Sequence, residues 1–228
     1  MKLPAVAGHA VDLSQTIENG MTVYVGDAVP KISALRRLEK DGVNLSIMTL
    51  GSHTGTHVDA PVHFIKGGKA LDQISVENFI GEAVVLDFSG IRPGCEISAS
   101  ALQKHSGEVG RGDIVLLYTG LSRRWEDPRA RRTITYLGGE AARWLVRRGV
   151  KAVGIDYLSV EKFGAKVPVA HVTLLSHEIP IIESLNKNLS RLVGRRVLFF
   201  CLPIKVGGCD GAPARAIAYP LRGDGGKR

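Results

Sequence analysis

Short apolar runs recur along the chain and indicate strands. Runs of roughly four to eight apolar residues bounded by turn residues are typical of strands that are buried on both faces. The later runs in this chain have that buried character. We predict strands at residues 43–50, 83–88, 113–118, 151–156 and 197–202.

Helical patterns fall between these runs. Ser75 is placed to cap a turn that continues through Ile80, and Ser98 is placed to cap a helix that reaches about His105. The segment GEAARWLVRRG, residues 139–149, has apolar residues at helical spacing and ends in a glycine, a common helix stop. Strands that alternate with helices predict an α/β fold.

Length and composition fit one folded domain. The chain has 228 residues, of which 44% are hydrophobic and 23% are charged. No linker or repeat divides it, so we expect a single domain over residues 1–228, with a frayed tail from about 222 to 228. Three cysteines in unrelated contexts favour a reducing compartment, and no segment is apolar enough for a signal peptide or a membrane span. We therefore expect a cytoplasmic protein without a membrane partner.

The net charge of +8 raises the question of nucleic acid. The densest basic run is SRRWEDPRARR, residues 122–132, which acidic residues and a proline interrupt. A surface on which bases stack needs aromatic residues among the arginines, and Trp125 is the one aromatic residue in this run. A solvated loop or a subunit contact is the favoured interpretation, and no nucleic-acid partner is expected.

The segment HTGTHVDAPVHF, residues 53–64, is rich in metal-ligand side chains. His53, His57, Asp59 and His63 all have odd numbers, and alternate side chains of an extended chain share one face. Buried without a cation, these groups would lack partners at a considerable cost in free energy, whereas a divalent ion would satisfy them together. A water-exposed loop would carry them at no cost, so the spacing favours a metal site without proving one.

Neighbouring residues refine this picture. Pro61 has no amide hydrogen for a strand, so we expect the strand to end near it and the chain to turn His63 inwards. Gly55 fits either a close approach of backbone and metal or a bulge. Farther along, Asp156 and Ser159 follow a predicted strand, a position that suits either the edge of a site or a simple turn. The remaining histidines, read as structural, are His9, His105 and His177.

HTGTHVDAPVH resembles the signature of the cyclase family of metal-dependent hydrolases, which includes bacterial kynurenine formamidases and isatin hydrolases. The family pattern His-x-Gly-Thr-His-x-Asp-x-Pro-x-His is matched at every position. AHVTLLSHEIPIIESL resembles the family's histidine followed twelve positions later by glutamate, here His171 and Glu183. LPIKVGGCDGAPARAIA resembles the family's closing Leu-Pro…Asp-Gly-x-Pro-x-Arg segment, so the likeness runs from about Asp12 to Ala218.

The resemblance implies a swivelling β/β/α fold, a homodimer or higher homo-oligomer, and one or two divalent ions per chain. Zinc is the expected ion and manganese the alternative, because imidazole and carboxylate suit both. The implied metal ligands are His53, His57, Asp59, His171 and Glu183, with His63 as the acid/base. A bound divalent ion lowers the pKa of its water to roughly 7, and an imidazole with a pKa of about 6.5 can move the protons.

Two departures from the formamidase pattern concern the substrate. Formamidases of this family tend to have Trp and then Pro-Gly-Asp near the N-terminus, where this chain has Tyr24 and Val25 before Gly-Asp. They also tend to have Thr-Pro after Gly-Ile-Asp, whereas this chain has Tyr-Leu. The resemblance implies that Tyr24 contacts a small-molecule substrate, and the other interpretation is a core or interface aromatic.

The leading hypothesis is therefore a metal-dependent hydrolase that uses activated water to cleave an amide bond, in an aryl formamide or in a cyclic amide or lactone. A metal-dependent cyclase or lyase acting on a non-amide substrate is the alternative among enzymes. A basic binding protein with a structural metal is the alternative of a different class.

Overall fold

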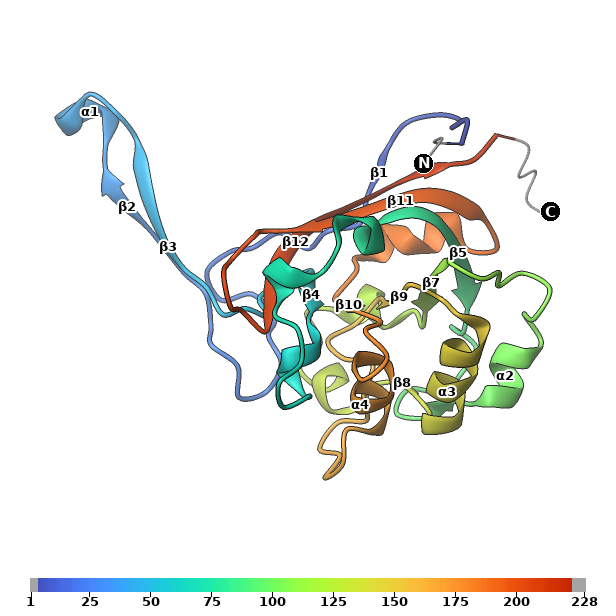
Figure 1. Ribbon diagram of the computed structural model, residues 1–228. Helices are drawn as coiled ribbons and strands as arrows, with labels where there is room; N and C mark the ends of the chain where they lie inside the picture. The colour runs from blue at the N-terminus through green and yellow to red at the C-terminus, as the bar shows by residue number, and fades with distance from the viewer. Residues whose placement is uncertain (1–3, 223–228) are drawn as a thin grey trace.

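A strongly curved sheet forms the centre of the computed structural model, which describes residues 4–222 (Figure 1). Its strands follow the order β1-β12-β11-β5-β7-β9-β10-β4, and a further pairing of β12 with β4 closes the sheet into a ring with β1 attached outside. Neighbours from β5 to β10 are parallel, and the other pairs are antiparallel. The bounds are β1 (Val11–Asp12), β4 (His57–Asp59), β5 (Ile80–Asp87), β7 (Ile114–Tyr118), β9 (Ala152–Ile155), β10 (Ile181–Glu183), β11 (Arg196–Pro203) and β12 (Gly211–Pro220).

Helices cover the parallel part of the sheet. They are α2 (Ala99–Gln103), α3 (Gly139–Arg148) and α4 (Val169–Leu175), beside a small sheet of β6 (Glu96–Ile97) and β8 (Tyr136–Leu137) (Figure 1). Short 3₁₀ helices complete the body: η1 (Pro61–His63), η2 (Leu71–Gln73), η3 (Val76–Phe79), η4 (Leu121–Arg124), η5 (Ala130–Arg132) and η6 (Lys187–Leu192). No helix within residues 4–222 has the length and apolar character needed to cross a membrane.

Both faces of the sheet are buried, which explains the continuous apolar runs. Along β5, Val84 and Leu86 pack in the cluster shared with the helices, whereas Ala83 and Val85 pack in the cluster on the other face. Strands of this kind lose the alternation of polar and apolar residues. The prediction of an α/β fold is confirmed by this arrangement of strands and helices.

A hairpin extends away from the body. It consists of β2 (Lys31–Arg36) and β3 (Leu45–Thr49), joined through the single-turn helix α1 (Leu38–Asp41) (Figure 1). The strand predicted at residues 43–50 is therefore present, but every residue of β3 is exposed.

The predicted helix ends agree with the structure. The Ser98 hydroxyl accepts a hydrogen bond from the Ala101 amide at 3.2 Å, as an N-cap should. Gly149 has a φ of +68° and ends α3 in the left-handed conformation that glycine adopts without strain. The Ser75 hydroxyl accepts from the Glu77 amide at the start of η3. The sequence patterns did not predict strands β10 and β12 or helix α4. The frayed tail expected from about residue 222 lies, beyond that residue, outside the described residues.

The basic stretch at residues 122–132 folds as turns against the body. Arg124 pairs with Asp127 at 2.6 Å, and the Arg123 guanidinium lies 5.9 Å from the centre of the Tyr118 ring. Trp125 is buried and packs edge-on against Tyr157. The one aromatic side chain of this stretch is thus part of a hydrophobic cluster instead of a surface for stacking bases.

Asp156 organises the turn that follows β7, so its capping interpretation is confirmed. Its fully buried carboxylate accepts hydrogen bonds from the amide and hydroxyl of Thr119, the amide of Gly120, and the amide and hydroxyl of Ser122. Burial raises the pKa of this carboxyl despite these donors. Ser159, by contrast, does lie at the edge of a cavity.

Asp156→Ala is expected to destabilise the protein by roughly 2–4 kcal/mol, because several buried donors lose their acceptor. Urea unfolding measures the change, with Asp127→Ala as the control that removes an exposed carboxylate nearby. Equal unfolding midpoints for the two variants would contradict this role of Asp156.

Candidate metal centre

Strand β4 positions two of the candidate ligands. His57 and Asp59 are alternate residues of this strand and lie on one face, as the sequence pattern predicts. The antiparallel partner β10 places Glu183 directly opposite His57. On the other side of β4, β12 places Gly211 opposite Asp59. Three segments that are far apart in the sequence therefore meet at one point of the ring.

His53 reaches the same point by a different route, and the prediction of an extended chain through His53 is wrong. His53 lies in a turn before β4, and Gly55 has a φ of +65°. The φ of Gly55 favours glycine, and a β-carbon there would lie 3.2 Å from Ile17 Cγ1, a tight contact. Since Gly55 lies before β4, it is not a bulge of that strand, and it is part of the cavity lining.

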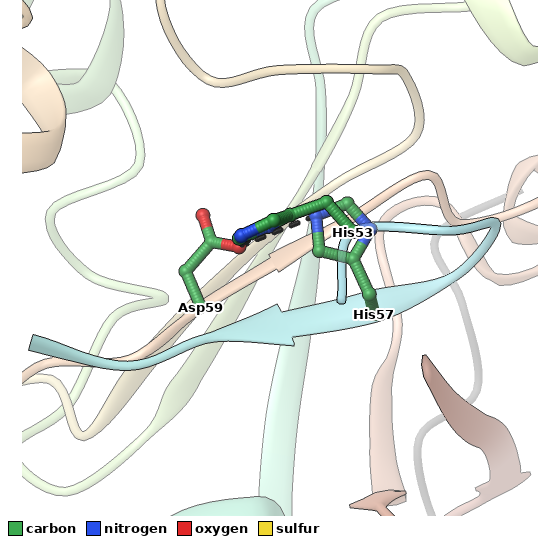
Figure 2. Close-up of side chains that lie close together, drawn as sticks. All are labelled: His53, His57 and Asp59. Atoms are coloured by element: carbon green, nitrogen blue, oxygen red, sulfur yellow. Dashed lines mark hydrogen bonds and ion pairs between the residues drawn. The ribbon is translucent and has the colours of Figure 1, made fainter. Parts of the chain in front are cut away.

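Two histidines converge on one oxygen of Asp59 (Figure 2). Asp59 Oδ1 lies 2.8 Å from His53 Nδ1 and 3.2 Å from His57 Nε2. Since the Gly55 carbonyl lies 2.8 Å from His57 Nδ1 and can only accept, that nitrogen carries the proton and Nε2 has a free lone pair.

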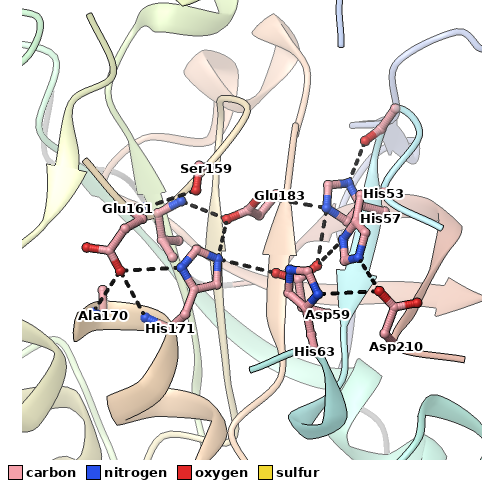
Figure 3. Close-up of polar contacts among 12 residues, drawn as sticks. His53, His57, Asp59, His63, Ser159, Glu161, Ala170, His171, Glu183 and Asp210 are labelled. Atoms are coloured by element: carbon pink, nitrogen blue, oxygen red, sulfur yellow. Dashed lines mark hydrogen bonds and ion pairs between the residues drawn. The ribbon is translucent and has the colours of Figure 1, made fainter. Parts of the chain in front are cut away.

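The second oxygen of Asp59 faces the other half of the centre. His171, on α4, has its Nε2 3.5 Å from Asp59 Oδ2 and 3.3 Å from Glu183 Oε1 (Figure 3). Glu183 Oε2 in turn lies 3.7 Å from His57 Nε2. The two carboxylates thus lie between the three imidazoles of His53, His57 and His171.

His63 lies beside these groups. Strand β4 ends at Asp59 and η1 begins at Pro61, so the expected end of the strand near the proline is confirmed. The His63 ring centre is 4.1 Å from that of His53, and His63 Nδ1 lies 3.3 Å from Asp210 Oδ2. The turn at Pro61 therefore directs this imidazole towards the centre.

Two acidic residues near the centre were not singled out from the sequence. Glu161 Oε2 accepts from the Ala170 amide at 2.9 Å and lies 3.4 Å from His171 Nδ1. Asp210 Oδ2 lies 2.9 Å from His53 Nε2. Asp210 is the aspartate of the family's closing Asp-Gly-x-Pro-x-Arg pattern, to which the sequence analysis gave no role. Glu161 lies within the span of the resemblance but in none of the quoted motifs.

Electrostatics favour protonation of His53 and His171 in the absence of a cation. Burial opposes charge on His53, but hydrogen bonds with Asp59 and Asp210 outweigh it and raise the pKa of His53 to about 9. The neighbouring carboxylates of Asp59, Glu161 and Glu183 likewise outweigh burial and raise the pKa of His171 well above 6.5. Burial also disfavours charge on Asp59, yet the three imidazoles around it hold its pKa well below 3.8. Burial lowers the pKa of His63.

The donor set fits divalent cations. His53, His57 and Asp59 form one group of ligand atoms within 4.8 Å of one another, and Asp59, His171 and Glu183 form a second. Among residues 4–222, His57 Nε2 and Asp59 Oδ2 are buried atoms without a hydrogen bond. Such atoms are costly to bury, and a cation bound by imidazole and carboxylate removes that cost.

The centre lies at the wall of a cavity of about 440 Å³. Polar groups of the centre and apolar side chains both line it, a combination typical of small-molecule sites. Tyr24 is part of the lining, and its ring packs 5.8 Å from that of Phe163. Other lining residues are Val23, Asp27, Phe64, Leu158, Ser159, Lys162, Lys166 and Pro168.

Comparison with known proteins agrees with this geometry. The family model named Cyclase matches residues 11–162, about two thirds of the chain. The chain belongs to the cyclase family. Among curated relatives of this cyclase-family chain, the kynurenine formamidase of Bacillus cytotoxicus is 32% identical over 217 residues, which cover 94% of this chain and 99% of the relative. The Bacillus anthracis kynurenine formamidase is 29% identical, with 92% and 97% covered.

Solved structures of the cyclase family have the same fold. A potential metal-dependent hydrolase with cyclase activity superposes with a TM-score of 0.79 at 27% identity, over 92% of this chain and 97% of the other. An isatin hydrolase bound to the product analogue thioisatinate superposes with a TM-score of 0.84, over 93% of this chain and 92% of the other. Its identity of 22% supports the fold alone.

Metal binding to the apoprotein is expected to release more than one proton per chain at pH 7. His53 and His171 are protonated there because their pKa values are raised, and a ligand imidazole must be neutral. For each displaced proton, the affinity for the metal falls about tenfold with every pH unit below the pKa of the histidine that carries it. Calorimetry of metal binding in buffers of different ionisation enthalpy measures the proton release. His177→Gln is the control, because it removes an exposed histidine outside the centre. Binding heats that are the same in every buffer would contradict the assignment of His53 and His171 as ligands.

Proposed function

We propose that this chain is a metal-dependent hydrolase that cleaves an amide bond, in an aryl formamide or in a cyclic amide or lactone. The observation that carries the proposal is the pair of carboxylates Asp59 and Glu183 among three imidazoles, beside His63 and a cavity of small-molecule size. The activities named for the kynurenine formamidase relatives point to the same bond.

The proposed ligands of a first ion are His53, His57 and Asp59, and those of a second are Asp59, His171 and Glu183. Asp59 offers one oxygen to each group, so it is the proposed bridge. Zinc is the favoured ion and manganese the alternative, because nitrogen and carboxylate donors suit both. When bound, a divalent ion lowers the pKa of water to roughly 7 and polarises a carbonyl group.

His63 is the proposed acid/base. It is not a member of either ligand group around Asp59, and its lowered pKa keeps it neutral at pH 7. A neutral imidazole accepts a proton from the attacking water and then delivers it to the leaving nitrogen. Tyr24 is the proposed wall for an aromatic substrate ring, because it lines the cavity and its orientation is supported by Phe163.

His63→Ala is expected to retain metal and fold but to lower turnover roughly 10²–10⁴-fold, the usual contribution of positioned proton transfer. Asp59→Ala is expected to lose metal and turnover together, because both ligand groups share Asp59. Elemental analysis and kinetics on the same preparations measure both effects. Equal loss of metal in the two variants would make His63 a ligand, and full turnover of metal-loaded His63→Ala would refute the mechanism.

The experiment that tests the function is a panel of N-formylanilines, cyclic imides and lactones, assayed with zinc and with manganese. Hydrolysis that stops on chelation and returns with added metal is the expected result. Folding that fails on chelation, without turnover of any compound, would instead favour a structural metal in a binding protein. Turnover confined to non-amide substrates would favour the cyclase or lyase alternative.

We also propose a cytoplasmic homodimer or higher homo-oligomer, in which a second copy covers the hairpin of residues 31–49. The family resemblance implies the homo-oligomer, and the exposed apolar side chains of the hairpin suggest where the copies meet. A two-stranded hairpin is at best marginally stable in water, and exposed apolar patches mark interaction surfaces. Exposed apolar side chains of the hairpin include Leu35 at 60%, Leu38 at 56%, Ile47 at 51% and Met48 at 64%.

Ile47→Glu combined with Met48→Glu is expected to convert the oligomer to monomer, because buried charges in an apolar contact are unfavourable. Light scattering coupled to size-exclusion chromatography measures the mass. Val76→Glu is the control, since it places the same charge at an exposed apolar site outside the hairpin. An unchanged mass in the double variant would exclude the hairpin from the interface.

A further inference from the structure

One oxygen of Asp210 lies between two functional imidazoles. Asp210 Oδ2 is 2.9 Å from His53 Nε2 and 3.3 Å from His63 Nδ1 (Figure 3). The two rings lie face to face at a centre-to-centre distance of 4.1 Å, tilted by 33°. Asp210 therefore contacts both a proposed ligand of the first ion and the proposed acid/base.

The backbone holds Asp210 firmly at this place. The Ala60 amide donates to the Asp210 carbonyl at 2.8 Å, which continues the pairing of β4 with β12. A β-carbon on Gly211 would lie 2.7 Å from the Val58 carbonyl oxygen and 3.0 Å from His53 Cε1. Glycine at this position thus lets the chain that carries Asp210 approach His53 closely.

The contact with His53 decides which nitrogen faces the ion. His53 Nδ1 is directed to Asp59 and Nε2 to Asp210. With an ion at Nδ1, the Asp210 carboxylate would keep the proton on Nε2 and so leave the Nδ1 lone pair for the ion. In the same way, the Glu161 carboxylate contacts Nδ1 of His171. The other nitrogen of that ring, Nε2, faces Asp59 and Glu183. A carboxylate behind a ligand histidine fixes ring orientation and raises the basicity of the ligand.

The contact with His63 distinguishes Asp210 from Glu161. A carboxylate at His63 Nδ1 orients the ring, keeps the proton on that nitrogen, and leaves Nε2 to exchange the proton of the reaction. It also stabilises the imidazolium that forms when His63 accepts a proton.

We propose that Asp210 is a positioning residue that orients the ligand His53 and the acid/base His63 through one carboxylate oxygen. This inference rests on the proposed function for the role of His63. Asp210, His53 and His63 also form a group that could hold an ion, so direct ligation by Asp210 is an outcome that the experiment must distinguish.

The experiment compares wild type, Asp210→Asn, Asp210→Glu and the matched control Glu161→Gln, all loaded with zinc. Asparagine keeps the shape of Asp210 while removing the charge, and Glu161→Gln removes a carboxylate from a ligand histidine without contact to His63 in the described structure. The measurements are zinc content, zinc affinity by chelator competition, histidine tautomers by ¹⁵N NMR, and kcat and KM on the compound that the panel identifies.

Both Asp210→Asn and Glu161→Gln are expected to bind zinc about 10–100-fold more weakly. At saturating zinc, Glu161→Gln should regain turnover, whereas Asp210→Asn should keep a kcat about 10–100-fold low at unchanged KM. The Nδ1-protonated form of His63 should be lost in Asp210→Asn, and Asp210→Glu should restore part of kcat.

Two outcomes would overturn the inference. One is Asp210→Asn with unchanged zinc affinity and unchanged His63 tautomer. The other is the loss of a zinc ion per chain in Asp210→Asn while Glu161→Gln retains it, which would make Asp210 a ligand. Because zinc affinity and tautomer need no substrate, failure of the amide panel would refute the proposed function and leave this test valid.

Discussion

The buried carboxylate of Asp59 is the group around which the candidate metal centre is arranged. Its side chain is 1% exposed, with histidines from the turn before β4, from β4 and from α4 around its two oxygens. A carboxylate removed from water in this way must be matched by positive charge. Protonated imidazoles supply that charge in the apoprotein, and divalent cations would supply it in the active protein. The same residue thereby links folding, metal binding and the proposed chemistry.

The closed sheet explains how such distant residues meet. Strand β4 pairs with β10 on one side, which places Glu183 opposite His57, and with β12 on the other. Asp210, the residue before β12, lies beside His53 and His63. Helix α4 adds His171, which Glu161 holds in place. The imidazoles of His53 and His171 each have a second carboxylate neighbour, Asp210 and Glu161, that can fix the orientation of the ring.

Sequence patterns predicted the parts of the fold that have local causes. The buried strands, the Ser98 cap and the end of α3 at Gly149 follow from apolar runs and capping chemistry. The extended path does not continue through His53, because the chain turns before β4 and Gly55 there adopts a φ of +65°. Asp210 and Glu161 were missed because their partners lie 157 and 10 residues away, and a side-chain contact leaves no periodic pattern. Family motifs identified the residues around Asp59, whereas spacing alone left a metal site unproven.

Anomalous diffraction at the zinc edge from zinc-loaded crystals tests the central claim most directly, because it locates ions without reference to any substrate. We expect an ion in contact with Asp59, His53 and His57, and a second in contact with Asp59, His171 and Glu183. An ion bound instead by His53, His63 and Asp210, with Asp59 contacting no metal, would contradict it.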